Sequence, residues 1–217
     1  ELERVQIEMQ DTADSVGGDV VVFGSAIFNS EFEEALIDSL SLMIPAVIVL
    51  ILVFLLFAYR DPIDLVLGLV SLFLAVIWTF GFVGHARIPF NQMMVAVPPL
   101  LLAVGIDFGI HAVNRYREER VEGKGPYEGM VIANEQLVVA FFIVTGTTAI
   151  GFGANMTSDL PAIFDFGFVA SLGIIFTFLI FGIFLPAAKL YLDELRQGTR
   201  IPDFGQQPLG DEDSPLG

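Results

Sequence analysis

A single acidic side chain, Asp107, lies inside a long apolar stretch of the sequence, and it is the residue there best suited to chemistry. An aspartate at the centre of a membrane-spanning helix costs roughly 2.5–3.5 kcal/mol, so Asp107 is expected to face protein or a water-filled cavity. His111 and Asn114 follow at i+4 and i+7, which places all three side chains on one helix face. A carboxyl group kept from water holds its proton more tightly, so this acid could exchange protons near neutral pH.

Two interpretations of Asp107 remain open at this point. Its protonation could drive a rearrangement of helices, or it could be a structural acid that accepts hydrogen bonds from hydroxyl groups; its isolation favours the first. Thr145 and Thr148, three residues apart in a later apolar segment, are the candidate hydroxyl partners, although threonines also serve helix packing. His111 could extend a proton path, tune Asp107, or be a histidine near the helix end. The predicted proton relay comprises Asp107, His111, Thr145 and Thr148.

Two glycines, Gly105 and Gly109, fall almost on the opposite face of the same helix. Glycines four residues apart let another helix backbone approach closely, so we expect this helix to have neighbours on both faces and to be central. Pro98 and Pro99 remove two amide donors, which predicts a kink one to two turns before the glycines.

The apolar residues, which make up 54% of the 217-residue chain, fall into five blocks that lack charged residues except for Asp107. The blocks are 39–59, 65–86, 92–114, 136–158 and 166–188. Each is close to the roughly 20 residues that cross a hydrocarbon core. We therefore predict an all-α membrane protein with a bundle of five transmembrane helices.

The flanks differ from the spans because they hold most of the acids behind the net charge of −16. Residues 19–23 (DVVVF) predict a short strand, and 29–38 a helix capped by Asn29 or Ser30 that runs into the first span. We interpret 1–38 as the α/β remnant of an extracytoplasmic domain, 39–195 as the five-helix domain and 196–217 as a disordered acidic tail. Acidic flanks argue against a nucleic-acid partner.

The connections are predicted from turn residues. A short turn at 60–62 and loops at 84–89 and 155–161 join the spans, and Leu185–Pro186 is expected to end the last one. The charged segment 116–135 is expected to contain a separate interfacial helix that starts near Pro126.

The basic residues predict the orientation. Those on the side where the odd-numbered spans exit are Arg60, Arg115, Arg117, Arg120, Lys124, Lys189, Arg196 and Arg200, whereas Arg4 and Arg87 lie opposite. By the positive-inside rule the N-terminus is extracytoplasmic and the C-terminus cytoplasmic. His85 then lies across the membrane from His111, and without cysteine no metal site is predicted. The sequence shows no phosphate loop or GxSxG motif, so neither a cofactor nor enzyme activity is expected.

The run GIDFGIH at 105–111, followed by NRYREE at 114–119, closely resembles the fourth transmembrane helix of resistance-nodulation-division (RND) exporters, in particular the MMPL-type branch that exports hydrophobic molecules. Supporting pieces occur in the same order at 57–62, 78–81, 147–152, 165–167 and 185–187. The resemblance covers roughly residues 19–195.

This resemblance implies that the chain corresponds to the last strand of a porter domain plus helices two to six of one exporter half. It implies that Asp107 is the proton-relay acid of a multi-pass plasma-membrane protein. The implied partners are membrane lipids, a hydrophobic or lipid substrate, and either a second RND half or a homo-oligomer. The first helix, most of the porter domain and the second half are expected to lie outside this sequence.

Two alternatives remain. The sterol-sensing domain resembles this five-helix arrangement and would make the chain a lipid-sensing or scaffolding module. The protein-export accessory (SecD/SecF-like) branch also uses an aspartate in this helix, but the residues Phe108 to His111 fit it less well.

Overall fold

The computed structural model describes residues 5, 12 and 25–197, and the elements in this part of the chain are helices. They are α2 (Ser25–Tyr59), α3 (Pro62–His85), η1 (Gln92–Ala96), α4 (Val97–Val121), α5 (Pro126–Gly153), η2 (Ala154–Thr157), α6 (Pro161–Leu179), the π-helix η3 (Ile180–Phe184) and α7 (Leu185–Gln197). Within the described residues, five segments are long and apolar enough to cross a membrane, which confirms the predicted spans. The predicted strand at 19–23 and the tail at 198–217 lie outside the described residues.

The chain divides into two units, Glu1–Ile51 and Leu52–Gly217. Between residue 25 and the end of the first unit, the backbone is the N-terminal part of α2. This helix begins at Ser25, so the predicted caps Asn29 and Ser30 lie inside it. No glycine or proline separates Ser25 from these residues, and the helix therefore starts earlier than the capping pattern suggested.

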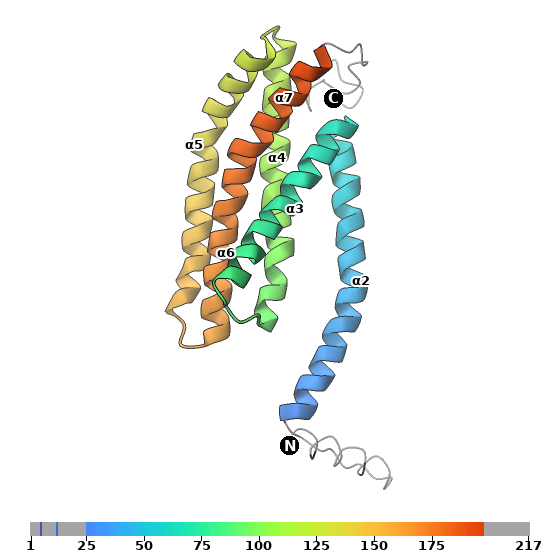
Figure 1. Ribbon diagram of the computed structural model, residues 1–217, viewed down its shortest axis with the longest axis vertical. Coiled ribbons are helices and arrows are strands. Elements are labelled where there is room, and N and C mark those ends of the chain that lie inside the picture. The colour runs from blue at the N-terminus through green and yellow to red at the C-terminus, as the bar shows by residue number, and fades with distance from the viewer. Residues whose placement is uncertain (1–4, 6–11, 13–24, 198–217) are drawn as a thin grey trace. The chain divides into compact units, whose positions relative to one another are not determined.

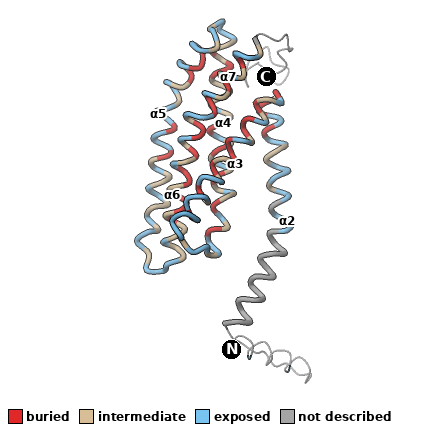
Figure 2. The backbone as a smooth tube through the Cα atoms, viewed as in Figure 1, coloured by how far each residue is buried: buried red, intermediate tan, exposed pale blue. Residues whose placement is uncertain are grey.

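In the second unit, successive long helices run in opposite directions, and α6 continues through η3 into α7 (Figure 1). Helix α6 contacts α3, α4 and α5, while α4 contacts α3, α5 and α6. The buried residues lie mainly along the inward sides of these helices (Figure 2). Helix α4, which carries Asp107, thus contacts several other helices of this unit.

An apolar cluster holds α3, η1, α4 and α6 together. Its buried members are Val83, Met94, Val97, Leu101, Val169, Ala170 and Ile174. At Gly173 of α6 a Cβ atom would lie 2.8 Å from Leu101 Cδ1 and 3.1 Å from Thr79 Cγ2. The absence of a side chain there lets α6 approach both neighbours.

Short polar turns start the helices. Arg60 adopts a positive φ of 54°, and the Asp61 carboxylate then accepts a hydrogen bond from Ile63 N at 3.0 Å. Pro62 follows as the first residue of α3. On the other side of the bundle, Asn91 accepts hydrogen bonds from two backbone amides and caps η1. The predicted turn at 60–62 is therefore present, whereas the predicted loop at 84–89 begins only after His85, where α3 ends, and continues to Asn91.

The prediction that Pro98 and Pro99 kink the helix one to two turns before the glycines is wrong. Both prolines lie in the first turn of α4, where the amide groups have no helical acceptor, so they interrupt no hydrogen bond within that helix. The chain instead changes from the tighter η1 to α4 at Val97.

Two predicted boundaries are also wrong. Helix α5 begins at Pro126, as predicted, but it runs without a break to Gly153, so the predicted interfacial helix and the fourth span form one continuous helix. Leu185–Pro186 does not end the fifth span, because the helix continues through η3 into α7 as far as Gln197. A helix tolerates Pro186 here because the wider π-turn pairs Leu185 N with Ile180 O.

Candidate functional site

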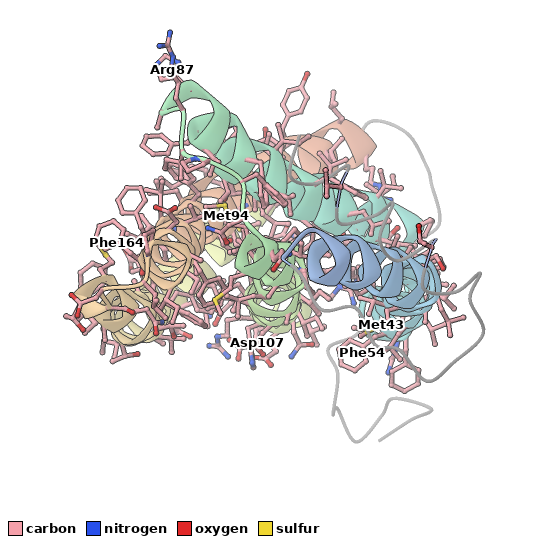
Figure 3. The ribbon with its side chains drawn as sticks, turned by 90° about the horizontal axis from the view of Figure 1, so that it is seen from below. Met43, Phe54, Arg87, Met94, Asp107 and Phe164 are labelled. Carbon is pink, nitrogen blue, oxygen red and sulfur yellow. The ribbon has the colours of Figure 1, made fainter. Side chains whose placement is uncertain are left out.

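The Asp107 carboxylate lies midway along α4 and pairs with His111 on the next turn. Asp107 Oδ1 is 3.4 Å from His111 Nε2, and the two side chains are 68% and 62% exposed. In the view along the helices, Asp107 points away from the bundle at its outer edge (Figure 3). The expected protein neighbour is therefore not supplied within the second unit, where α4 is enclosed on one face but open on the other.

The open face continues as a line of polar residues. Asn114 Nδ2 donates a hydrogen bond to Glu118 Oε1 at 3.1 Å, and Arg115 pairs with Glu118 and Glu119. We call Asp107, His111, Asn114 and Glu118 the α4 polar stripe. Its members follow at intervals of three or four residues, so the stripe extends from the middle of the span to its basic end.

The glycine face of α4 is filled by neighbouring side chains. A Cβ atom at Gly105 would lie 2.7 Å from Leu72 Cδ2 and 2.8 Å from Phe181 Cε2. At Gly109 it would lie 2.9 Å from Phe181 Cε1 and would also meet the Tyr59 hydroxyl group. These distances leave no room for any side chain at either glycine, so α3 and η3 pack directly on the α4 backbone behind Asp107.

The predicted hydroxyl partners lie on α5, which packs against α4 through the stacked rings of Phe108 and Phe141, 4.4 Å apart. Thr148 Oγ1 donates to Val144 O at 2.7 Å. Thr145 is buried, and its hydroxyl group has no hydrogen-bond partner within the described part of the chain. The structure thus brings Asp107 together with His111 and not with either threonine, and the relay role of the threonines stays a prediction.

A second charged group, which was not predicted from the sequence, is buried where α3, α4 and α7 meet. Asp64 lies 2.8 Å from Arg117 Nη2 and 2.7 Å from Lys189 Nζ. Lys189 also donates to Asp193 Oδ1 at 2.9 Å, and Tyr116 donates its hydroxyl proton to Asp193 Oδ2 at 2.9 Å. Arg117 further donates to Tyr59 O, the last carbonyl of α2. We call Asp64, Arg117, Lys189 and Asp193 the buried ion cluster.

The buried ion cluster is electrically neutral, because two carboxylates balance one guanidinium and one ammonium group. Each of these four side chains is at most 8% exposed. The Asp64–Lys189 contact is an ion pair, and the hydrogen bond of Lys189 is directed to Asp193. Removing one member would leave an uncompensated buried charge, which costs about 3–5 kcal/mol.

A neighbouring ion pair closes the turn between α2 and α3. Arg196 donates to both Asp61 oxygens, at 2.6 and 3.0 Å. Burial alone would raise the pKa of Asp61, but the hydrogen bonds from Arg196 and Ile63 N outweigh it and hold that pKa below its usual value. Helix α7 is thus fastened to the start of α3 through charged groups as well as apolar contacts.

Similarity to known proteins shows which family this chain belongs to. Residues 1–196 match the MMPL family. The chain belongs to the MMPL family. It is similar to MJ1562 of Methanocaldococcus jannaschii, whose name describes it as a membrane protein, with 30% identity over 186 residues. The match covers 86% of this chain but 48% of the relative, so the chain spans about half the length of the curated relative that it matches.

Membership of the MMPL family, together with the five spans, makes this chain a multi-pass membrane protein. The MMPL-type resemblance that the GIDFGIH run indicated is therefore correct.

The sequence did contain a signal for the buried ion cluster of this MMPL-family chain. Lys189 and Asp193 are four residues apart beyond Pro186, which is the spacing of an ion pair on one helix face. The expectation that the helix ends at Pro186 placed them in a solvated flank instead.

Proposed function

We propose that this chain is the membrane-embedded, proton-coupling part of an RND-type exporter of lipids or other hydrophobic molecules. The observation that carries the proposal is the Asp107–His111 pair, an acid and a base 3.4 Å apart in the middle of a 30-residue span. Membership of the MMPL family supports the transport class.

The energetics of an intramembrane acid suit this role. Charged Asp107 costs roughly 2.5–3.5 kcal/mol at the centre of a span, whereas a protonated carboxyl group costs much less. Moving one charge through 100 mV supplies about 2.3 kcal/mol, which is comparable with that penalty. Gain and loss of a proton at Asp107 can therefore bias the position of α4.

The open α4 polar stripe supports a second part of the proposal, namely that another exporter half covers it. A carboxylate that is 68% exposed on a span would otherwise face acyl chains. This partner half is either a further copy of the chain or a different segment. With the basic ends of α4 and α7 in the cytoplasm, Glu118 at the end of the stripe lies at the cytoplasmic surface.

The test uses the full-length protein that contains this chain, reconstituted in vesicles with an imposed proton gradient. Asp107→Asn keeps the shape of the side chain and removes its titration, so gradient-driven export of a fluorescent lipid and the accompanying proton flux should both stop. Asp165→Asn, an acid-to-amide change in the first turns of α6, is the matched control and should leave both unchanged.

Gradient-driven export that persists in Asp107→Asn would refute the relay. Saturable lipid binding that is independent of Asp107, without any gradient-driven transport, would instead indicate a sterol-sensing module.

A further inference from the structure

The π-helix η3 lies behind Asp107 and interrupts the fifth span there. Phe181 of η3 is buried, and its ring fits against Gly105 and Gly109, which precede and follow Asp107 by two residues. A Cβ atom at either glycine would lie within 2.9 Å of that ring. Helix α4 therefore cannot shift toward η3 or turn about its axis unless Phe181 moves.

The origin of η3 is Pro186. Proline has no amide hydrogen, and in an α-helix its ring would collide with the carbonyl of Gly182 four residues earlier. The chain avoids this collision by widening one turn, in which Leu185 N bonds Ile180 O. Gly182 lies within the same turn and has no side chain. The space beside it is open, since a Cβ atom there would meet a single neighbour, Phe178 Cε2, at 3.9 Å. The turn departs from regular α-helical hydrogen bonding, while its side chains Ile180 and Phe181 remain buried.

The segments on either side of η3 are held firmly. Before it, Val169, Ala170 and Ile174 of α6 belong to the apolar cluster with α3 and α4. After it, Lys189 and Asp193 of α7 belong to the buried ion cluster. A turn without regular α-helical hydrogen bonds between two anchored segments is the arrangement of a hinge.

We propose that η3 is a hinge, and that Phe181 is the contact through which a change in the protonation of Asp107 reaches α6. When α4 shifts, its glycine face displaces the Phe181 ring, and the wide turn lets α6 tilt while the ion cluster holds α7. Phe181 is thus a positioning residue that acts through α4. The inference rests on the proposed function, because it requires Asp107 to titrate.

The chain contains a built-in reporter of this movement. Trp78 is the one tryptophan in the sequence. Its ring on α3 packs edge-on against Phe176 of α6, with centroids 6.0 Å apart, and Phe176 precedes η3 by about one turn. A tilt of α6 would change this contact, and with it the emission of Trp78.

The experiment follows Trp78 emission of this chain in lipid nanodiscs as the pH is varied. Within the described residues, the titratable group that pairs with Asp107 is His111 on α4 itself. On the opposite, glycine face of α4 the neighbouring helices present Leu72, Phe181 and one further titratable group, the Tyr59 hydroxyl group of α2. The native chain should show a pH-dependent change that is absent in Asp107→Asn and retained in Asp159→Asn, the same acid-to-amide change at an exposed position outside the relay.

The hinge is tested by Pro186→Ala and Phe181→Leu. The first restores an amide donor, and the second replaces the ring that spans both glycines with a smaller side chain. Each should reduce the amplitude of the pH-dependent change in Trp78 emission about fivefold or more, which is the lower end of the usual coupling between sites. Thermal unfolding of Pro186→Ala should remain close to native, because this change removes no charge or buried polar partner. Phe181→Leu leaves a cavity at a buried site and should lower the unfolding temperature by a few degrees, which still leaves the chain folded. Phe178→Leu, whose ring packs on Phe142 of α5, is the matched control and should titrate normally.

The possible results are separable. A native amplitude in both Pro186→Ala and Phe181→Leu, with the change lost in Asp107→Asn, would overturn the hinge but leave the relay intact. A change that persists in Asp107→Asn would overturn the proposed function and the hinge together. Loss of the change in Pro186→Ala with unfolding close to native, or in Phe181→Leu while that variant is still folded, supports the hinge.

Discussion

Asp64→Asn should destabilise the bundle strongly. Asp64 is 1% exposed and lies within 2.8 Å of one cation and 2.7 Å of another. The amide would leave Arg117 and Lys189 with Asp193 as the one remaining acid of the cluster, and an uncompensated buried charge costs about 3–5 kcal/mol. At about 2–4 °C per kcal/mol for a domain of this size, the unfolding temperature should fall by roughly 6–20 °C.

The measurement is thermal unfolding in detergent, followed by Trp78 emission. Asp159→Asn changes an exposed acid in the same way and should alter stability by less than about 0.5 kcal/mol. Adding Lys189→Met to Asp64→Asn removes one charge of each sign and restores neutrality, so the double variant should be more stable than Asp64→Asn alone. If Asp64→Asn costs less than about 1 kcal/mol and the second change only adds to the loss, the cluster is not sealed from water and the reasoning fails.

Two further predictions use the same unfolding assay. Gly109→Ala should lower the free energy of unfolding by about 1–3 kcal/mol, because its methyl group would meet Phe181 and the Tyr59 hydroxyl group. Gly146→Ala is the control and should be neutral or stabilising, because a Cβ atom there would have no heavy atom within 4 Å. Equal effects of the two changes would contradict the packing of Phe181 on Gly109. The lowered pKa of Asp61 means that its pairing with Arg196 stabilises the fold above the ordinary value of 3.8 and is lost as the pH falls through the folded value. The native chain should therefore be more stable than Asp61→Asn at pH 6, and the difference should vanish in strong acid; a constant difference would exclude this linkage.

The spans were predictable because their cause is local. A block of about 20 apolar residues is sufficient to define a membrane helix, whatever it packs against. The start of α3 was equally predictable, since Asp61 and Pro62 supply a cap and a first helical residue without help from other segments.

The buried ion cluster was not predictable in the same way, because its members come from segments far apart in sequence. Asp64, Arg117 and Lys189 meet only after α3, α4 and α7 have packed. The fate of Pro186 likewise depends on its surroundings: proline ends most helices, but here neighbouring helices hold the chain in place and one widened turn absorbs the clash.

The spacing of Asp107, His111 and Asn114 identified the correct face of α4 but not what covers it. Helical periodicity fixes which side chains lie together, whereas the identity of a neighbour depends on tertiary or quaternary packing. Within the second unit, neighbouring helices fill the glycine face and leave Asp107 and His111 exposed.

These contacts limit how α4 can respond to a proton. Arg117 ties its basic end to Asp64 and to the last carbonyl of α2, so that end cannot slide without breaking buried ion pairs. At the level of Asp107, Phe181 fills the glycine face. Two responses remain: α4 can move toward its open stripe, or it can push the Phe181 ring and bend the fifth span at η3. A partner that covers the stripe would block the first response and direct the movement into η3.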